Sequence, residues 1–89
     1  MTEQQHGPER IEEWLTAVAD GRVDRDTADR WAARRVLDEE LSWDEASWRA
    51  LQQLHGIDLR HGPGEPYLHD AEQVREWAAQ LRQRRAVRR

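Results

Sequence analysis

The chain has 89 residues, with 18 acidic side chains, 14 arginines and neither lysine nor cysteine. A chain of this length builds one domain around a single small core, and the absence of cysteine excludes disulfides and thiolate metal sites. No apolar stretch is long enough for a membrane span or a signal sequence, so we expect a cytoplasmic protein with no membrane contact.

Four segments have the apolar spacing of amphipathic helices, and none alternates like a strand over four or more residues. The first helix is predicted to begin at Pro8 and to end at Asp20, with Gly21 as its left-handed stop. Its apolar positions have i, i+3, i+4, i+7 spacing, which indicates one buried face. These positions are Ile11, Trp14, Leu15 and Val18.

The second helix is predicted to run from Arg25 to about Leu37, with Asp24 as its N-terminal cap. Its inward stripe is weak and is built partly from alanine, which lets a neighbouring helix approach closely. We therefore expect this helix to be the more exposed one. The stripe consists of Ala28, Trp31, Ala32, Arg35 and Val36.

The third helix is predicted over residues 43–55, because Ser42 and Glu45 have the spacing of a capping box. The cap explains Glu45, and the positive end of the helix dipole favours Asp44. Three consecutive acids remain at the C-terminal end of the second helix, where the dipole disfavours negative charge. They are Asp38, Glu39 and Glu40.

Residues 57–69 contain two glycines and two prolines, so no long helix crosses them. We expect both ends of this loop to dock on the core while its polar middle projects. Asp70 is predicted to cap the last helix, with Gln73 in the reciprocal position. The apolar stripe of this helix ends at Leu81, and the arginine-rich residues 82–89 are predicted to fray.

These elements predict an all-α, compact four-helix bundle in one domain, with a loop containing glycine and proline before the last helix. The predicted limits are a flexible N-terminus at 1–7, the four-helix domain at 8–81, and an arginine-rich C-terminal helix end or tail at 82–89. The predicted core consists of Ile11, Trp14, Leu15, Val18, Trp31, Val36, Leu37, Trp48, Leu51, Leu54, Leu59, Leu68, Val74, Trp77 and Leu81.

Charge is distributed unevenly along the chain. Residues 1–45 hold thirteen acids against six arginines, and residues 46–89 hold five acids against eight arginines. Because phosphate is repelled by negative charge, the acidic half argues against a nucleic-acid partner and favours a basic protein partner. A plain hydrated connector is the alternative explanation of the acids around residue 40.

Neither catalysis nor metal binding is indicated. The four histidines lack the spacing of a compact metal site, and neighbouring acids on a helix point apart instead of toward one substrate. The glycines form no phosphate-binding loop. We therefore expect no enzyme, no metal and no cofactor.

Two other functions stay open. A small DNA-associated regulatory or accessory protein could contact phosphate through the C-terminal arginines, which are Arg82, Arg84, Arg85, Arg88 and Arg89. The second and third helices resemble a helix-turn-helix, although that arrangement places acids near phosphate. A self-associating structural module could pair Trp31 and Trp43 across a two-fold axis, so both a monomer and a homodimer remain possible.

Residues 56–81 read GIDLRHGPGEPYLHDAEQVREWAAQL, a pattern similar to one found in small acidic proteins of high-GC actinobacteria. The acidic second helix, the glycine- and proline-containing segment with a tyrosine, and the closing VREW also resemble the colicin E-type nuclease immunity proteins. This resemblance implies a four-helix inhibitor of a basic nuclease. It implies that acids of the second helix and a tyrosine contact the toxin, although this chain has one tyrosine where that family has a pair.

The resulting hypothesis is an immunity or antitoxin protein that neutralises a cationic toxin, possibly a nuclease, with nucleic acid an unlikely partner. Electrostatic steering would speed association, and an aromatic side chain would supply binding energy. The predicted partner-binding residues are Asp29, Asp38, Glu39, Glu40, Trp43, Asp44, Asp58 and Tyr67.

Overall fold

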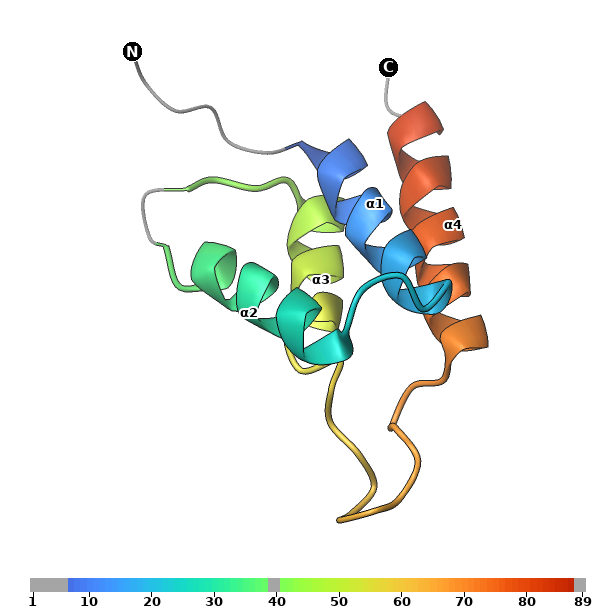
Figure 1. Ribbon diagram of the computed structural model, residues 1–89. Helices are drawn as coiled ribbons and strands as arrows, with labels where there is room; N and C mark the ends of the chain where they lie inside the picture. Colours follow the sequence, from blue (N-terminus) through green and yellow to red (C-terminus); the bar gives the residue numbers. More distant parts are fainter. Residues whose placement is uncertain (1–6, 39–40, 88–89) are drawn as a thin grey trace.

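The computed structural model describes residues 7–38 and 41–87 (Figure 1). Over these ranges the regular structure is helical, apart from a single isolated β-bridge, so the predicted all-α class with four helices is confirmed. The helices are α1 (Pro8–Ala19), α2 (Arg25–Val36), α3 (Glu45–Leu54) and α4 (Ala71–Val87).

The most extensive helix contact joins α1 and α4, which run antiparallel side by side (Figure 1). Two arginines of α4 reach across this contact. The Arg82 guanidinium lies 2.7 Å from the carboxylate of Glu12, and Arg75 lies 3.0 Å from Asp20. The second extensive contact joins α2 and α3, so α1 and α3 form the centre of the molecule.

The core contains most of the predicted apolar positions, together with several small residues. Leu15, Leu51, Leu54 and Val74 are fully buried, and each such aliphatic side chain contributes about 1.5–3 kcal/mol when it is removed from water. Small side chains allow the helices to approach closely and fill the space between them. The buried small residues include Ala19, Ala28, Ala32, Ser47, Ala50 and Ala78.

Three leucines predicted to lie in the core are exposed instead. Leu37 is 75% exposed, because it follows the last residue of α2 and therefore lies outside the helix to which it was assigned. Leu59 and Leu68 are exposed as well, because they belong to a loop that leaves the bundle. Trp48 is 37% exposed, and Ile57 rather than Leu59 anchors the start of the loop in the core.

Two helix ends follow the sequence signals closely. Gly21 has a φ of 76°, and the Arg22 amide donates to the Ala17 carbonyl at 2.9 Å, which together form a Schellman end. At the start of α4, the Gln73 amide donates to a carboxylate oxygen of Asp70 at 2.9 Å, as a capping residue requires.

Two other helix ends differ from the prediction. Helix α3 begins two residues later than predicted, with Asp44 as its N-cap residue. The prediction of a capping box with Ser42 as the N-cap is therefore wrong. The segment before Asp44 is extended instead, and Trp43 in it packs against the core. Helix α4 continues beyond Leu81 to Val87, and the fraying of residues 82–89 stays a prediction.

The loop between α3 and α4 projects from the bundle (Figure 1), as predicted. Its two arms pair locally, because Arg60 and Tyr67 form the β-bridge and the His61 amide donates to the Pro66 carbonyl at 3.0 Å. The tip turns at Gly64, whose φ of 77° strains any residue other than glycine. The loop is thus an ordered, short hairpin-like arm.

Arg25 at the start of α2 holds the base of this arm. Its Nη1 donates to the carbonyls of Ile57 and His69, at 3.1 and 2.7 Å. Its guanidinium carbon lies 4.0 Å from the centroid of the Tyr67 ring, and that of Arg60 lies at the same distance from the same ring. Burial lowers the pKa of Arg25, but an arginine stays charged at neutral pH.

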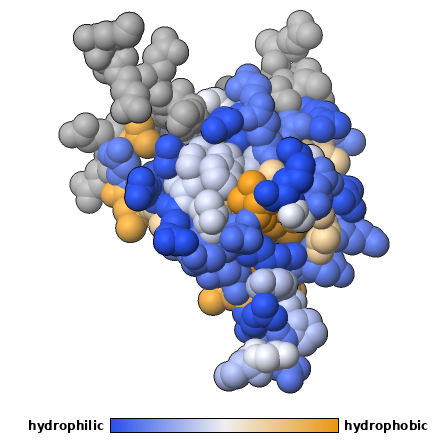
Figure 2. Space-filling model, in the orientation of Figure 1, coloured by the Kyte–Doolittle hydropathy of each residue, from blue (hydrophilic) through white to orange (hydrophobic). Residues whose placement is uncertain are grey.

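The described residues contain no helix of the length and apolarity needed to span a membrane. On the face shown in Figure 2 the apolar areas are small and separate, and hydrophilic surface surrounds them. Such scattered apolar groups are usual on a protein surface and do not mark a large interface on that face. The residues predicted as a flexible N-terminus, apart from Gly7, lie outside the described ranges.

Candidate functional site

The exposed side of α2 carries a group of arginines. Ala28 and Ala32 are buried, and the small side chains let the backbone of α2 pack closely. With 3.6 residues per turn, the helix side opposite these alanines faces solvent and carries Arg30 and Arg34, one turn apart. Both arginines are exposed, and Arg34 has no carboxylate partner among the described residues.

Two tryptophans border these arginines. Trp14 of α1 stacks on Trp31 of α2, with ring centroids 4.9 Å apart and planes inclined by 23°. Arg35 also lies over the Trp31 ring, with its guanidinium carbon 4.3 Å from the centroid, and its Nη1 donates to the Trp31 carbonyl at 3.0 Å. The stack therefore fixes the position of an arginine as well as joining two helices.

These groups line a shallow hollow of about 310 Å³ between α1 and α2. Its charged lining is entirely positive, although Arg30 forms a surface ion pair with Asp26 one turn earlier on α2. Exposed pairs of this kind contribute only about 0–1 kcal/mol, so a phosphate can compete for the arginine. The lining residues are Trp14, Thr27, Arg30, Trp31, Arg34 and Arg35.

A larger hollow of about 590 Å³ lies over α1 and shares Trp14 with the first. Its lining holds three glutamates and three arginines, and two pairs form between them. Arg10 pairs with Glu13 at 3.0 Å, and Arg82 pairs with Glu12 at 2.7 Å. Because three negative and three positive side chains line it, the α1 hollow has no excess of charge of either sign.

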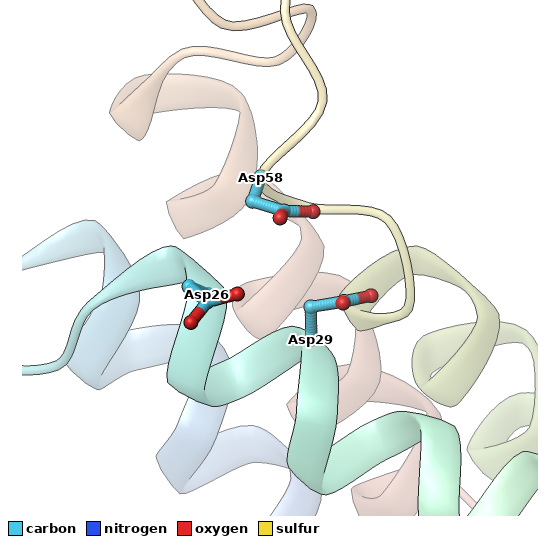
Figure 3. A group of neighbouring side chains, drawn as sticks. All are labelled: Asp26, Asp29 and Asp58. Carbon is cyan, nitrogen blue, oxygen red and sulfur yellow. The ribbon is translucent and has the colours of Figure 1, made fainter.

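Asp26, Asp29 and Asp58 form an acidic group near the N-terminal end of α2 (Figure 3). One carboxylate oxygen from each lies within 4.8 Å of the others. Asp29 already has a structural role, because its Oδ1 accepts the Gly56 amide at 2.6 Å and lies 3.0 Å from Nδ1 of His55. Negative charge at a helix N-terminus is also favourable, so this group needs no bound metal to explain it.

Several residues predicted to bind a partner have contacts within the protein. Asp29 joins α2 to the end of α3, and Tyr67 lies against two arginines. Trp43 packs against the core with its indole nitrogen buried, so Trp48 is more exposed than Trp43. Asp44 is the half-buried N-cap residue of α3.

The remaining predicted partner-binding residues are not brought together with these. Asp38 is exposed, whereas Asp58 is half-buried beside Asp29 on another part of the molecule. Glu39 and Glu40 lie outside the described residues. The predicted acidic contact surface therefore stays a prediction, and its described members are divided between different junctions of the fold.

The C-terminal arginines are only partly described. Arg82 is engaged with Glu12, whereas Arg84 is exposed and has no ion-pair partner among the described residues. The side chains of Arg85, Arg88 and Arg89 lie outside the described part of the chain. Positive charge at the end of α4 also complements the helix dipole.

The arginine face of α2 was missed because charge was summed over residues 1–45. That half is strongly acidic overall, but its arginines are concentrated locally at positions 30, 34 and 35. The i, i+4 spacing of Arg30 and Arg34 was the available signal, since it places both on one side of a helix. The contribution of Trp14 from another helix has no such local signal.

Comparison with known proteins identifies the family but no individual relative. A family model described as YxzC DNA-binding protein matches residues 6–81. No curated protein and no solved structure gives a significant match. The inferred likeness to colicin-type immunity proteins is therefore wrong. The hypothesis of an antitoxin that binds a basic toxin, with nucleic acid an unlikely partner, is wrong as well. From residue 6 to residue 81, the chain belongs to the YxzC DNA-binding protein family.

Proposed function

We propose that this protein binds DNA as a small regulatory or accessory protein, with the exposed face of α2 that carries Arg30 and Arg34 as its contact surface. The observation that carries the proposal is the hollow whose charged lining is Arg30, Arg34 and Arg35, in a chain whose family is described as DNA-binding. We also expect the protein to act in the cytoplasm, as its lack of cysteine predicts.

The geometry of this surface suits phosphate. Arg30 and Arg34 have Cβ atoms about 5–6 Å apart along one helix face, a separation that lets them contact neighbouring phosphates of one strand. Guanidinium groups bind phosphate oxygens through two parallel hydrogen bonds, which makes each contact both strong and oriented. Arg35 adds a third positive charge to the hollow, and its guanidinium lies over the Trp31 ring.

The net charge of −4 does not oppose this function, because several of the acids are engaged in contacts within the protein. Asp29 accepts the Gly56 amide, Glu12 pairs with Arg82 of α4, and Glu13 pairs with Arg10 of α1. At about 0.15 M salt, charges more than about 8 Å apart are largely screened, so the local positive group governs the contact with phosphate.

A second candidate surface is the end of α4, where Arg84 is exposed. It agrees with a DNA-binding role but lacks a hollow or an aromatic neighbour that would position the arginines. Deleting residues 84–89 removes four arginines and leaves the charged lining of the α2 hollow intact. We expect this deletion to weaken binding less than substitution of the two α2 arginines.

Fluorescence anisotropy with labelled duplex and single-stranded DNA tests the proposed function. We expect saturable binding at low salt, with dissociation constants of about 1–100 µM, that weakens steeply as salt is added. Absence of binding to either DNA at low salt, by a protein with a helical circular dichroism spectrum, would refute the proposal.

A further inference from the structure

We infer that the α2 hollow binds single-stranded DNA in preference to duplex DNA, with an unpaired base stacking on Trp31. This inference rests on the proposed function and specifies the form of DNA. It follows from the narrowness of the positive surface, from the acids beside it and from the tryptophan in its wall.

The positive surface is narrow. Arg30 and Arg35 limit it along α2, a distance of about 7–8 Å at the rise of 1.5 Å per residue. A helix in the major groove, which is about 12 Å wide, meets the phosphates of two strands at once. A single strand presents only one line of phosphates, which the α2 arginines can follow.

The surroundings of the hollow disfavour the second strand of a duplex. Trp14 lines both hollows, so the α1 surface with exposed Glu9 and Glu13 begins directly beside the arginines. Asp26 lies before Arg30 on α2, and Asp38 follows the helix. A rigid second strand laid across α2 would bring its phosphates near these carboxylates, whereas a flexible single strand can turn away from them.

The Trp31 ring offers an aromatic surface to an unpaired base. Trp14 stacks on this ring, and Arg35 lies over it as a cation–π partner. A cation–π contact is worth about 0.5–1 kcal/mol at an exposed site and about 2 kcal/mol when it is desolvated, and stacking of a base on an aromatic side chain is worth about 1–3 kcal/mol. Arg35 is half-buried and also donates to the Trp31 carbonyl, so a base that replaces it on the ring has to stack at the upper end of that range. The displaced guanidinium can then bind the adjacent phosphate.

The hollow has a suitable size for such an exchange. Its volume of about 310 Å³ exceeds what one phosphate needs and lies at the lower end of the range of small-ligand sites. Bases in a duplex are stacked and paired, so exposing one there costs a few kcal/mol that a single strand does not lose. The combination of an arginine cluster with an aromatic platform is typical of binding to single strands.

The test compares ligands on the intact wild-type protein. We expect an oligothymidylate to bind at least about fivefold more tightly than a duplex of the same length, and tryptophan emission to be quenched when it binds. An oligonucleotide with the same phosphates but abasic sugars should bind about 5- to 100-fold more weakly than the oligothymidylate, since only stacking is lost.

The outcomes separate the inference from the proposed function. Equal or tighter binding of the duplex, or equal binding of the abasic strand, would overturn the single-strand inference while DNA binding stands. Tighter binding of the matching oligouridylate would overturn the assignment of DNA as the ligand. No binding of any probe would refute the proposed function itself.

A pair of variants locates the stacking. Trp31→Phe keeps an aromatic ring and should retain the preference for the oligothymidylate over the abasic strand, whereas Trp31→Leu should lose it. If Trp31→Leu fails to fold, the comparison of normal and abasic strands on the wild-type protein still decides whether a base stacks, and the Trp31→Phe protein is compared with it to locate the ring. A preference that survives in a folded Trp31→Leu protein would show that the base stacks elsewhere.

Discussion

Trp14 of α1 and Trp31 of α2 stack with their ring centroids 4.9 Å apart, and this pair forms the aromatic wall of the arginine hollow. The direct contact between α1 and α2 is otherwise the smallest of those among the helices. The stack therefore both fixes α2 relative to α1 and gives the hollow its shape.

Replacement of Trp14 tests the structural part of this statement. Trp14→Leu should lower the free energy of unfolding by about 1–3 kcal/mol, because it removes the stack and part of the packing against the core. Trp48→Leu is the matched control, since Trp48 is more exposed and should cost less. Urea unfolding followed by circular dichroism measures both, and an equal loss would contradict the role given to the stack.

The junction of α2 and α3 depends on one carboxylate. Asp29→Ala should destabilise the protein by about 1–2 kcal/mol, because the Gly56 amide loses its acceptor. Asp26→Ala, which removes only a surface ion pair with Arg30, should change the free energy of unfolding by less than about 0.5 kcal/mol. Chemical denaturation distinguishes the two, and equal effects would mean that the Gly56 bond contributes nothing.

The acid before the arginine face restrains DNA binding. Asp26→Asn releases Arg30 from its ion pair and removes a negative charge beside the hollow. We expect it to tighten DNA binding about two- to fivefold at low salt, the equivalent of a surface pair worth up to about 1 kcal/mol. Glu76→Gln, the same charge change on an exposed position of α4, should have a smaller effect. Anisotropy titrations of both variants test this, and unchanged affinity in Asp26→Asn would argue against a contact at Arg30.

Stability at acid pH depends in part on Asp20. The hydrogen bond from Arg75 is the main cause that lowers the pKa of Asp20 below its ordinary value of 3.8. A lowered pKa stabilises the fold above that ordinary value, and the stabilisation is lost as pH falls through the pKa of the folded state. Asp20→Asn should therefore be less stable than the wild type at neutral pH and nearly equal to it well below pH 3.8. Urea unfolding at both pH values measures the difference, and a constant difference would exclude this carboxylate as the cause.

The sequence predicted the helices well because their signals are local. Gly21 ends α1 with the positive φ that glycine favours, and the Asp70 carboxylate accepts the hydrogen bond from the Gln73 amide that defines a helix cap. The apolar spacing of α1 and α4 also identified most of their buried residues. Each of these features is determined by residues within a few positions of one another.

The errors concern contacts between residues far apart in the chain. Arg25 donates to carbonyls 32 and 44 residues away, and this fixes the base of the loop while Leu59 and Leu68 remain in solvent. Asp29 looked like a free surface acid until the fold brought Gly56 to it. No local pattern encodes such partners.

The functional error had a different physical origin. The charge summed over half of the chain concealed the arginines of α2, although phosphate responds to charge within about 8 Å at physiological salt. Charge has to be assessed for each helix face, and Trp14 and Arg34 became neighbours of one hollow only through the packing of α1 on α2.

The central claim is that Arg30 and Arg34 contact DNA phosphates, and the salt dependence of binding tests it most directly. The slope of log affinity against log salt changes by about 0.7 per phosphate contact for single strands and about 0.9 for duplex DNA. The double variant Arg30→Gln with Arg34→Gln should therefore have a slope shallower by about 1.4–1.8. The control, Arg49→Gln with Arg60→Gln, removes two exposed arginines that lie neither in the hollow nor at the end of α4, and it should leave the slope nearly unchanged. An unchanged slope in the α2 variant, or an equal decrease in the control, would contradict the account.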